Sequence, residues 1–178
     1  MIKIKIKNDF INIARLKSKD LGILRNSIRE GEGNFYGFLG ELVVADYFNV
    51  DVTNTYDYDV IINDLKCDVK TKQCTSPPRN NYDCSVAAYN TKQLCDVYIF
   101  TRICNDDCWI LGWLLKPHYF KKSVFLQKGM IDPSNNFKVK ADCYNVKIFD
   151  LYDIQTLKNF NITKENDIQS NFIKHVSV

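Results

Sequence analysis

The chain has 178 residues, of which 46% are hydrophobic and 25% are charged. That length suits one well-packed domain, the composition is ordinary for a globular protein, and no apolar run approaches the roughly 18–20 residues that a membrane span needs. The formal net charge of +3 permits a polyanionic partner without requiring one.

The N-terminal region predicts a strand followed by two helices. Residues 2–7 alternate apolar and basic side chains, a period of two that is typical of a strand. The segment lacks the apolar core of a secretory signal, so we expect a cytoplasmic protein with no membrane partner. Asn8 or Asp9 can cap the first helix, and the glycines of "REGEGN", residues 29–34, end it. A second helix is predicted over residues 35–48.

The stretch "TYDYDVIINDLKCDVKTKQ" predicts a β-hairpin. Apolar residues alternate with polar ones on both sides of Asn63 and Asp64, which favour turns. A turn centred there gives the hairpin one consistently apolar face, which supports this register. The pairs on that face are Tyr58 with Val69, Val60 with Cys67, and Ile62 with Leu65.

The other face of the hairpin is charged. The same register places Asp59 opposite Asp68 and Asp57 opposite Lys70. Directly opposed side chains have Cβ atoms roughly 4.5–5.5 Å apart, so the two aspartates repel each other unless solvent or a cation lies between them. Their oxygens suit Mg²⁺ or Mn²⁺, and Lys70 shares their face, where it can meet an anionic substrate. An edge strand with plainly alternating charges is the alternative.

Glu41 is a third acidic candidate. It lies on an otherwise apolar face of the second helix, where a carboxylate is unusual. Gly37 and Gly40 let that helix approach a neighbouring element closely. One interpretation is a partly exposed glutamate favoured by the helix dipole, and the other is an acid aimed at the same site as Asp59 and Asp68.

The rest of the chain predicts a sheet with helical pieces after it. Two prolines and two asparagines make residues 75–83 a loop. Strands, mainly antiparallel in appearance, are predicted over residues 84–88, 95–103, 108–115 and 143–151. Pro117 opens a short helix over residues 116–122, and a helix with a loose end follows residue 153. We therefore expect an α/β, or α+β-like, single domain over residues 1–178.

These residues together resemble the PD-(D/E)XK nuclease superfamily. Its core motif is an acid at a strand end, a hairpin, and a strand carrying acid-X-Lys, often with a further acid from a preceding helix. The matching stretches are "GELVVADYF" with Glu41, "YDYDVII" with Asp59, and "CDVKTKQ" with Asp68 and Lys70. The wider chain, to about residue 151, is similar to small phage- or virus-encoded members.

The sequence departs from the family pattern at two places. Tyr58 stands where the family usually has proline before the first acid, and Asp68 stands where it more often has glutamate. Asp57 could also take the part of Asp59. We prefer Asp59 because it directly precedes the apolar strand and faces Asp68.

The resemblance implies a restriction-endonuclease-like core, with a central mixed β-sheet flanked by helices, over about residues 34–151. Residues 1–33 would form an N-terminal strand and helix, and residues 152–178 a helical tail. Asp59, Asp68, the Val69 carbonyl and Glu41 would bind Mg²⁺ or Mn²⁺, and Lys70 would assist the attacking water. The implied activity is a deoxyribonuclease, and more narrowly an endonuclease of phage or viral DNA processing or recombination in the host cytoplasm.

DNA is the expected partner, and a homodimer is expected by analogy with relatives of this size. Phosphate and base contacts are expected from polar residues around the acid-X-Lys motif. These residues are Lys66, Lys72, Gln73, Arg79 and Lys92.

Three other functions stay open. The first is a protein of nuclease-like fold that binds DNA without cutting it. The second is a zinc-binding module, but neither Cys67 with Cys74 nor Cys104 with Cys108 has the usual spacing of a ligand pair. The seven cysteines are better read as reduced, mostly core thiols. The third is a thiol enzyme, for which only His118 and His175 are available as partners.

Overall fold

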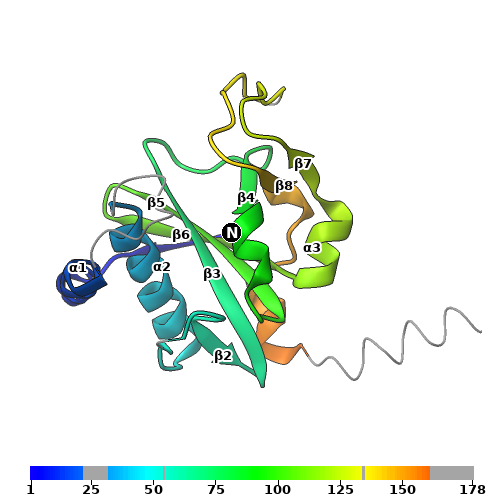
Figure 1. Ribbon diagram of the computed structural model, residues 1–178. Coiled ribbons are helices and arrows are strands. Elements are labelled where there is room, and N and C mark those ends of the chain that lie inside the picture. The colour runs from blue at the N-terminus through cyan, green and yellow to red at the C-terminus, as the bar shows by residue number, and fades with distance from the viewer. Residues whose placement is uncertain (22–31, 54, 134, 161–178) are drawn as a thin grey trace, which may run out of the picture.

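The computed structural model describes residues 1–21, 32–53, 55–133 and 135–160, and these form two β-sheets with helices around them (Figure 1). The first sheet has five strands in the order β1-β6-β5-β3-β2. The bounds are β1 Ile2–Lys5, β2 Val60–Ile62, β3 Leu65–Cys74, β5 Val97–Cys104 and β6 Asp107–Leu115. β3 and β5 are parallel and the other neighbours are antiparallel. The expected mixed sheet in an α/β fold is therefore confirmed.

Helices α1 (Asn8–Leu21) and α2 (Glu32–Phe48) lie on one side of this sheet (Figure 1). Alternate residues of β5, including Ile99 and Ile103, turn to this side and pack in one core with Val43 and Val44 of α2. The interior of α2 contains two glycines, which lower helix propensity. Burial of apolar surface is therefore what holds the helix in place.

A second sheet covers the other side, with strands in the order β4-β8-β7. Its strands are β4 Asp83–Ala87, β7 Val124–Leu126 and β8 Cys143–Lys147, and α3 (Lys116–Lys122) lies beside them. The rings of Tyr98 and Phe100 on β5 pack on Tyr119 of α3, with centroids 5.2 and 5.4 Å apart. Three short 3₁₀ segments complete the described structure: η1 Ala88–Lys92, η2 Ile148–Asp150 and η3 Ile154–Asn159.

The predicted register of the hairpin is confirmed. β2 and β3 pair through Val60–Cys67, Ile61–Lys66 and Ile62–Leu65. Asn63 and Asp64 have φ values of 50° and 62°, which is the geometry of a two-residue hairpin turn with positive φ at both positions. The ladder ends at Val60, so the predicted pairs of Asp59 with Asp68 and of Tyr58 with Val69 do not form. Tyr58 and Val69 pack in different cores, on opposite sides of the sheet.

The other predicted elements lie near their expected bounds, with five differences. β3 extends to Cys74 because it pairs with β5 from Cys67 onwards. The strand expected over residues 143–151 ends at Lys147 and continues as η2, and the sequence pattern does not predict β7. The helix expected after residue 153 is the 3₁₀ segment η3, and residues 161–178 lie outside the described structure. α2 begins at Glu32, inside the break predicted over residues 29–34. Residues 29–31 of that break lie outside the described structure.

Candidate active site

Helix α2 lies close against β3 at Gly40. A Cβ atom there would come within 2.0 Å of Thr71 Oγ1 and 2.9 Å of Thr101 Oγ1, so this approach requires glycine. Thr101 Oγ1 donates to Thr71 Oγ1 at 2.8 Å, which fixes both side chains beneath the helix. A Cβ atom at Gly37 would have nothing within 4 Å. The contact at Gly40 therefore sets the position of the next residue, Glu41.

Asp59 directly precedes β2 and binds the backbone of β3. Its N–H donates to the carbonyl of Cys67 at 2.9 Å, and its Oδ2 accepts from the N–H of Val69 at 2.7 Å. Val69 stands between the two motif residues Asp68 and Lys70, so this bond brings the Asp59 carboxylate to the middle of the acid-X-Lys motif. The β2 ladder ends at Val60, so no carbonyl of β2 accepts the Val69 N–H. The Asp59 carboxylate accepts it instead, and this hydrogen bond holds the side chain beside β3.

Asp68 and Lys70 form an ion pair on the opposite face of β3 from α2. Asp68 Oδ2 lies 2.6 Å from Lys70 Nζ, and their side chains are 4% and 16% exposed. Lys70 Nζ also donates to Gln93 Oε1 at 2.8 Å. No described group gives Asp68 Oδ2 a well-aligned hydrogen bond. We regard the 2.6 Å contact as an ion pair of imperfect geometry, which leaves this buried oxygen incompletely satisfied.

The three carboxylates interact electrostatically. Burial raises the pKa of Glu41 from 4.5 to about 7; Lys17 and Lys70 oppose the rise and Asp68 adds to it. Burial also raises the pKa of Asp59 well above its ordinary range, and the negative charges of Glu41 and Asp68 raise it further. The Val69 N–H and the Lys70 charge favour the ionised Asp59 but do not cancel this effect. Ionising Glu41 and Asp59 in this site therefore costs free energy, chiefly because both are buried and partly because of the neighbouring negative charges.

This donor set has the chemistry of a site for a divalent cation. Carboxylate oxygens are the hard ligands that Mg²⁺ and Mn²⁺ prefer, and a bound cation would stabilise the ionised carboxylates whose pKa values burial raises. The side chains are not yet gathered: within the described ranges, no three His, Cys, Asp or Glu residues are grouped so that they could hold a metal ion. Binding would require Asp68 to turn from Lys70 toward Asp59 and Glu41.

Asp57, the alternative to Asp59, lies elsewhere. Its Oδ1 accepts from the N–H of Leu94 at 3.0 Å, so it does not face Lys70 as the extended register predicts. The pKa of Asp59, by contrast, responds to the charges of Glu41, Asp68 and Lys70. The geometry thus favours Asp59 as the first acid of the motif.

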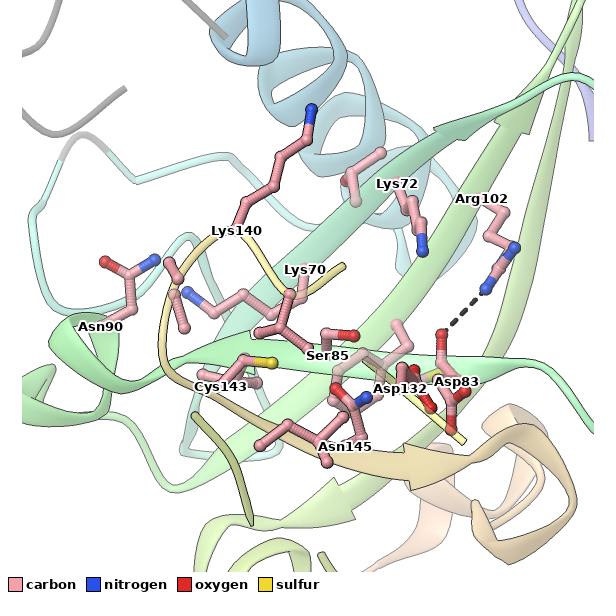
Figure 2. A pocket seen from close by; sticks show the side chains of 18 of the residues that line it. Lys70, Lys72, Asp83, Ser85, Asn90, Arg102, Asp132, Lys140, Cys143 and Asn145 are labelled. Atoms are coloured by element: carbon pink, nitrogen blue, oxygen red, sulfur yellow. Dashed lines mark hydrogen bonds between the residues drawn. The ribbon is translucent and has the colours of Figure 1, made fainter. Parts of the chain in front are cut away.

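The predicted DNA-contacting residues are spread over several surfaces. Lys72 lines a cavity on the same face as Lys70 (Figure 2), and Lys66 is exposed nearer the hairpin turn with its Nζ 5.5 Å from the Tyr58 ring. Gln73 lies on the opposite face and donates to the hydroxyl of Tyr36 on α2 at 2.6 Å. Arg79 and Lys92 are exposed, in the loop before β4 and at the end of η1.

Sequence reasoning missed Gln93 and most of the cavity wall. Gln93 holds Lys70 through Oε1 and donates through Nε2 to the Tyr56 carbonyl at 2.7 Å. It lies 23 residues from Lys70 in the chain, and no local pattern marks it.

The cysteines lie in several separate places. All seven are free thiols, and Cys67 is fully buried in the core under α2.

In the part of the chain that the structure describes, no helix is long and apolar enough to cross a membrane. No protein-family model matches the chain, and no curated protein matches it significantly. The resemblance to the PD-(D/E)XK superfamily therefore stays a prediction from the sequence motifs.

Proposed function

We propose that this chain is a metal-dependent deoxyribonuclease of the PD-(D/E)XK type. The observation that carries the proposal is that Glu41 of α2, Asp59 before β2, and Asp68 and Lys70 of β3 lie close enough for their charges to shift one another's pKa values. A helix acid, a strand-end acid and an acid-X-Lys strand joined by a hairpin are the parts that the resemblance requires. Buried carboxylates with raised pKa values beside Lys70 also favour a cation and an anionic substrate over a purely structural role.

In this proposal, Glu41, Asp59, Asp68 and the Val69 carbonyl would hold Mg²⁺ or Mn²⁺, which would supply Lewis-acid chemistry to activate water and to neutralise charge on the phosphate. Lys70 Nζ is held by Gln93 Oε1 and lies 2.6 Å from Asp68 Oδ2, beside the carboxylates that would bind the metal. It stabilises negative charge on the phosphate oxygens as the water oxygen attacks phosphorus and the bond to the leaving oxygen breaks. Endonuclease action in viral or phage DNA processing, in a host cytoplasm, is the most specific form of the proposal.

The test is incubation of the purified protein with linear, circular, branched and single-stranded DNA in Mg²⁺, Mn²⁺ or EDTA. We expect cleavage with either metal and none in EDTA. Asp68→Ala and Lys70→Ala should abolish cleavage while the melting temperature shows a folded protein. Asp106→Ala is the matched control, because Asp106 is a 73% exposed aspartate whose partner Lys5 is also at the surface.

The alternative of DNA binding without cleavage predicts a different result. If the wild-type protein binds DNA in gel-shift assays but cuts none of these forms with either metal, the nuclease proposal is wrong. Tightly bound zinc in the purified protein would favour the zinc module instead. A homodimer is proposed only by analogy, and light scattering at working concentration would measure it.

A further inference from the structure

A cavity of about 510 Å³ lies between the two sheets and begins at Lys70 (Figure 2). A sphere of this volume would be about 10 Å across. The cavity is too small to admit a DNA duplex, because the major groove alone, which is only part of the duplex, is about 12 Å wide. The volume falls within the range of sites for small molecules, roughly 300–1,000 Å³.

The walls of the cavity are cationic on the side of the first sheet. Lys72 on β3 and Arg102 on β5 are paired neighbours in the parallel ladder, and both line the cavity. Arg102 is only 6% exposed, and its Nη2 donates to the Asp83 carbonyl at 2.8 Å. Partial desolvation and the Arg102 charge lower the pKa of Lys72. Lys72 is exposed to the cavity and Arg102 is buried, and two cations side by side favour an anionic occupant.

Few negative charges oppose these cations. Lys138 and Lys140 add two more cations from the segment before β8. Asp83 is already paired with Lys147 at 2.7 Å, and Asp132 is the other acid in the lining. Charge therefore selects an anion for this cavity, beside the proposed active-site lysine.

The second sheet supplies a different kind of wall. Asn145 on β8 is 8% exposed and lines the cavity, yet its Oδ1 has no hydrogen-bond partner in the described structure. A buried polar atom without a partner costs free energy unless an occupant satisfies it. Ser85 lies beside it on the paired strand β4 (Figure 2). Phe137, which also lines the cavity and is 75% exposed, adds aromatic surface on which a flat ring could stack.

We propose that this cavity receives one unpaired nucleotide of the DNA strand, with its base against Asn145 and its phosphate toward Lys70 and Lys72. The inference deepens the proposed function, since it names the substrate as DNA with a nucleotide that is single-stranded, terminal or displaced from its pair. Unpaired bases are recognised in this way by stacking and by hydrogen bonds to their polar edges.

The test measures binding of free deoxyadenosine 5′-monophosphate by calorimetry in EDTA, so that it depends on neither metal nor cleavage. Deoxyribose 5-phosphate and inorganic phosphate are the comparison probes. We expect one nucleotide per chain, bound at least about tenfold more tightly than the sugar phosphate, because the base adds stacking and a hydrogen bond. Asn145→Ala should remove most of that difference, and Lys121→Ala, an exposed cation outside the cavity, should not.

Ser85→Trp is a second variant, which fills the cavity from an exposed strand position and should block nucleotide binding even if Asn145→Ala fails to fold. Equal binding of all three probes, or none of the nucleotide, would overturn the proposal. If the wild type cleaves DNA and Ser85→Trp cleaves it equally well, the cavity proposal is also wrong, while the nuclease proposal stands. Nucleotide binding that Ser85→Trp abolishes, without any cleavage by the wild type, would support the cavity and reject the nuclease.

Discussion

Replacing Glu41 with glutamine tests the electrostatic account of the site directly. A pKa of about 7 in place of 4.5 means that ionising Glu41 is harder in the folded protein than in the unfolded chain. At about 1.4 kcal/mol for each pKa unit, ionised Glu41 destabilises the folded protein by about 3 kcal/mol. Below pH 4.5 the group is protonated in both states and costs nothing. The stability of the metal-free wild type should therefore fall as pH rises from 4.5 to about 7.

Glu41→Gln has no charge to bury, so it should lack this dependence. At pH 8 in EDTA we expect it to melt roughly 6 to 12 °C above the wild type, and at pH 4.5 at nearly the same temperature. Removing the Glu41 charge also relieves Asp59, which acts in the same direction. The assay is thermal unfolding followed by circular dichroism at several pH values. Asp106→Asn, at an exposed site, should follow the wild type.

Divalent metal should reverse the order of the melting temperatures of Glu41→Gln and the wild type at pH 8. Mg²⁺ stabilises the folded state if it binds there, and more strongly where Glu41 is ionised. Wild-type protein should thus gain stability from Mg²⁺ at pH 8 and much less at pH 5, whereas Glu41→Gln should gain little at either pH. If Glu41→Gln melts at or below the wild type at pH 8 without metal, the account of a buried, repelled carboxylate is wrong.

Three further predictions concern other parts of the site. Gly40→Ala should destabilise the protein by about 1–3 kcal/mol in denaturant unfolding, because its Cβ would overlap Thr71. Gly37→Ala, its control, should stabilise the protein by about 0.5–1 kcal/mol, and equal effects of the two substitutions would contradict the close approach of α2. Asp59→Asn should keep the Val69 hydrogen bond and fold normally but lose cleavage, and a fully active variant would remove Asp59 from the site. Lys72→Ala should weaken DNA binding and reduce the slope of log Kd against log salt concentration by about one. An unchanged slope would mean that Lys72 contacts no phosphate.

The hairpin was predictable because its information is local. Alternation with a period of two fixes which side chains share a face, and Asn63 and Asp64 accept the positive φ of the turn. The same alternation separates Gln73 from Asp68 and Lys70, and applying it consistently would have placed Gln73 on the α2 side. The extended register failed at Tyr58 because the ladder ends at Val60, and a regular pattern does not mark where pairing stops.

The sequence by itself determined that Asp68 and Lys70 share one face, that Cys67 is in the core, and that a helix carries Glu41. Only the tertiary structure brought Glu41 and Asp59 within electrostatic reach of Asp68 and Lys70, because the packing of Gly40 on Thr71 and the end of the β2 ladder depend on distant segments. It also decided the support of Lys70 by Gln93 and the cavity between the sheets. These features arise where β3 pairs in parallel with β5 and the second sheet folds over both, and local periodicity does not specify contacts between elements so far apart in the chain.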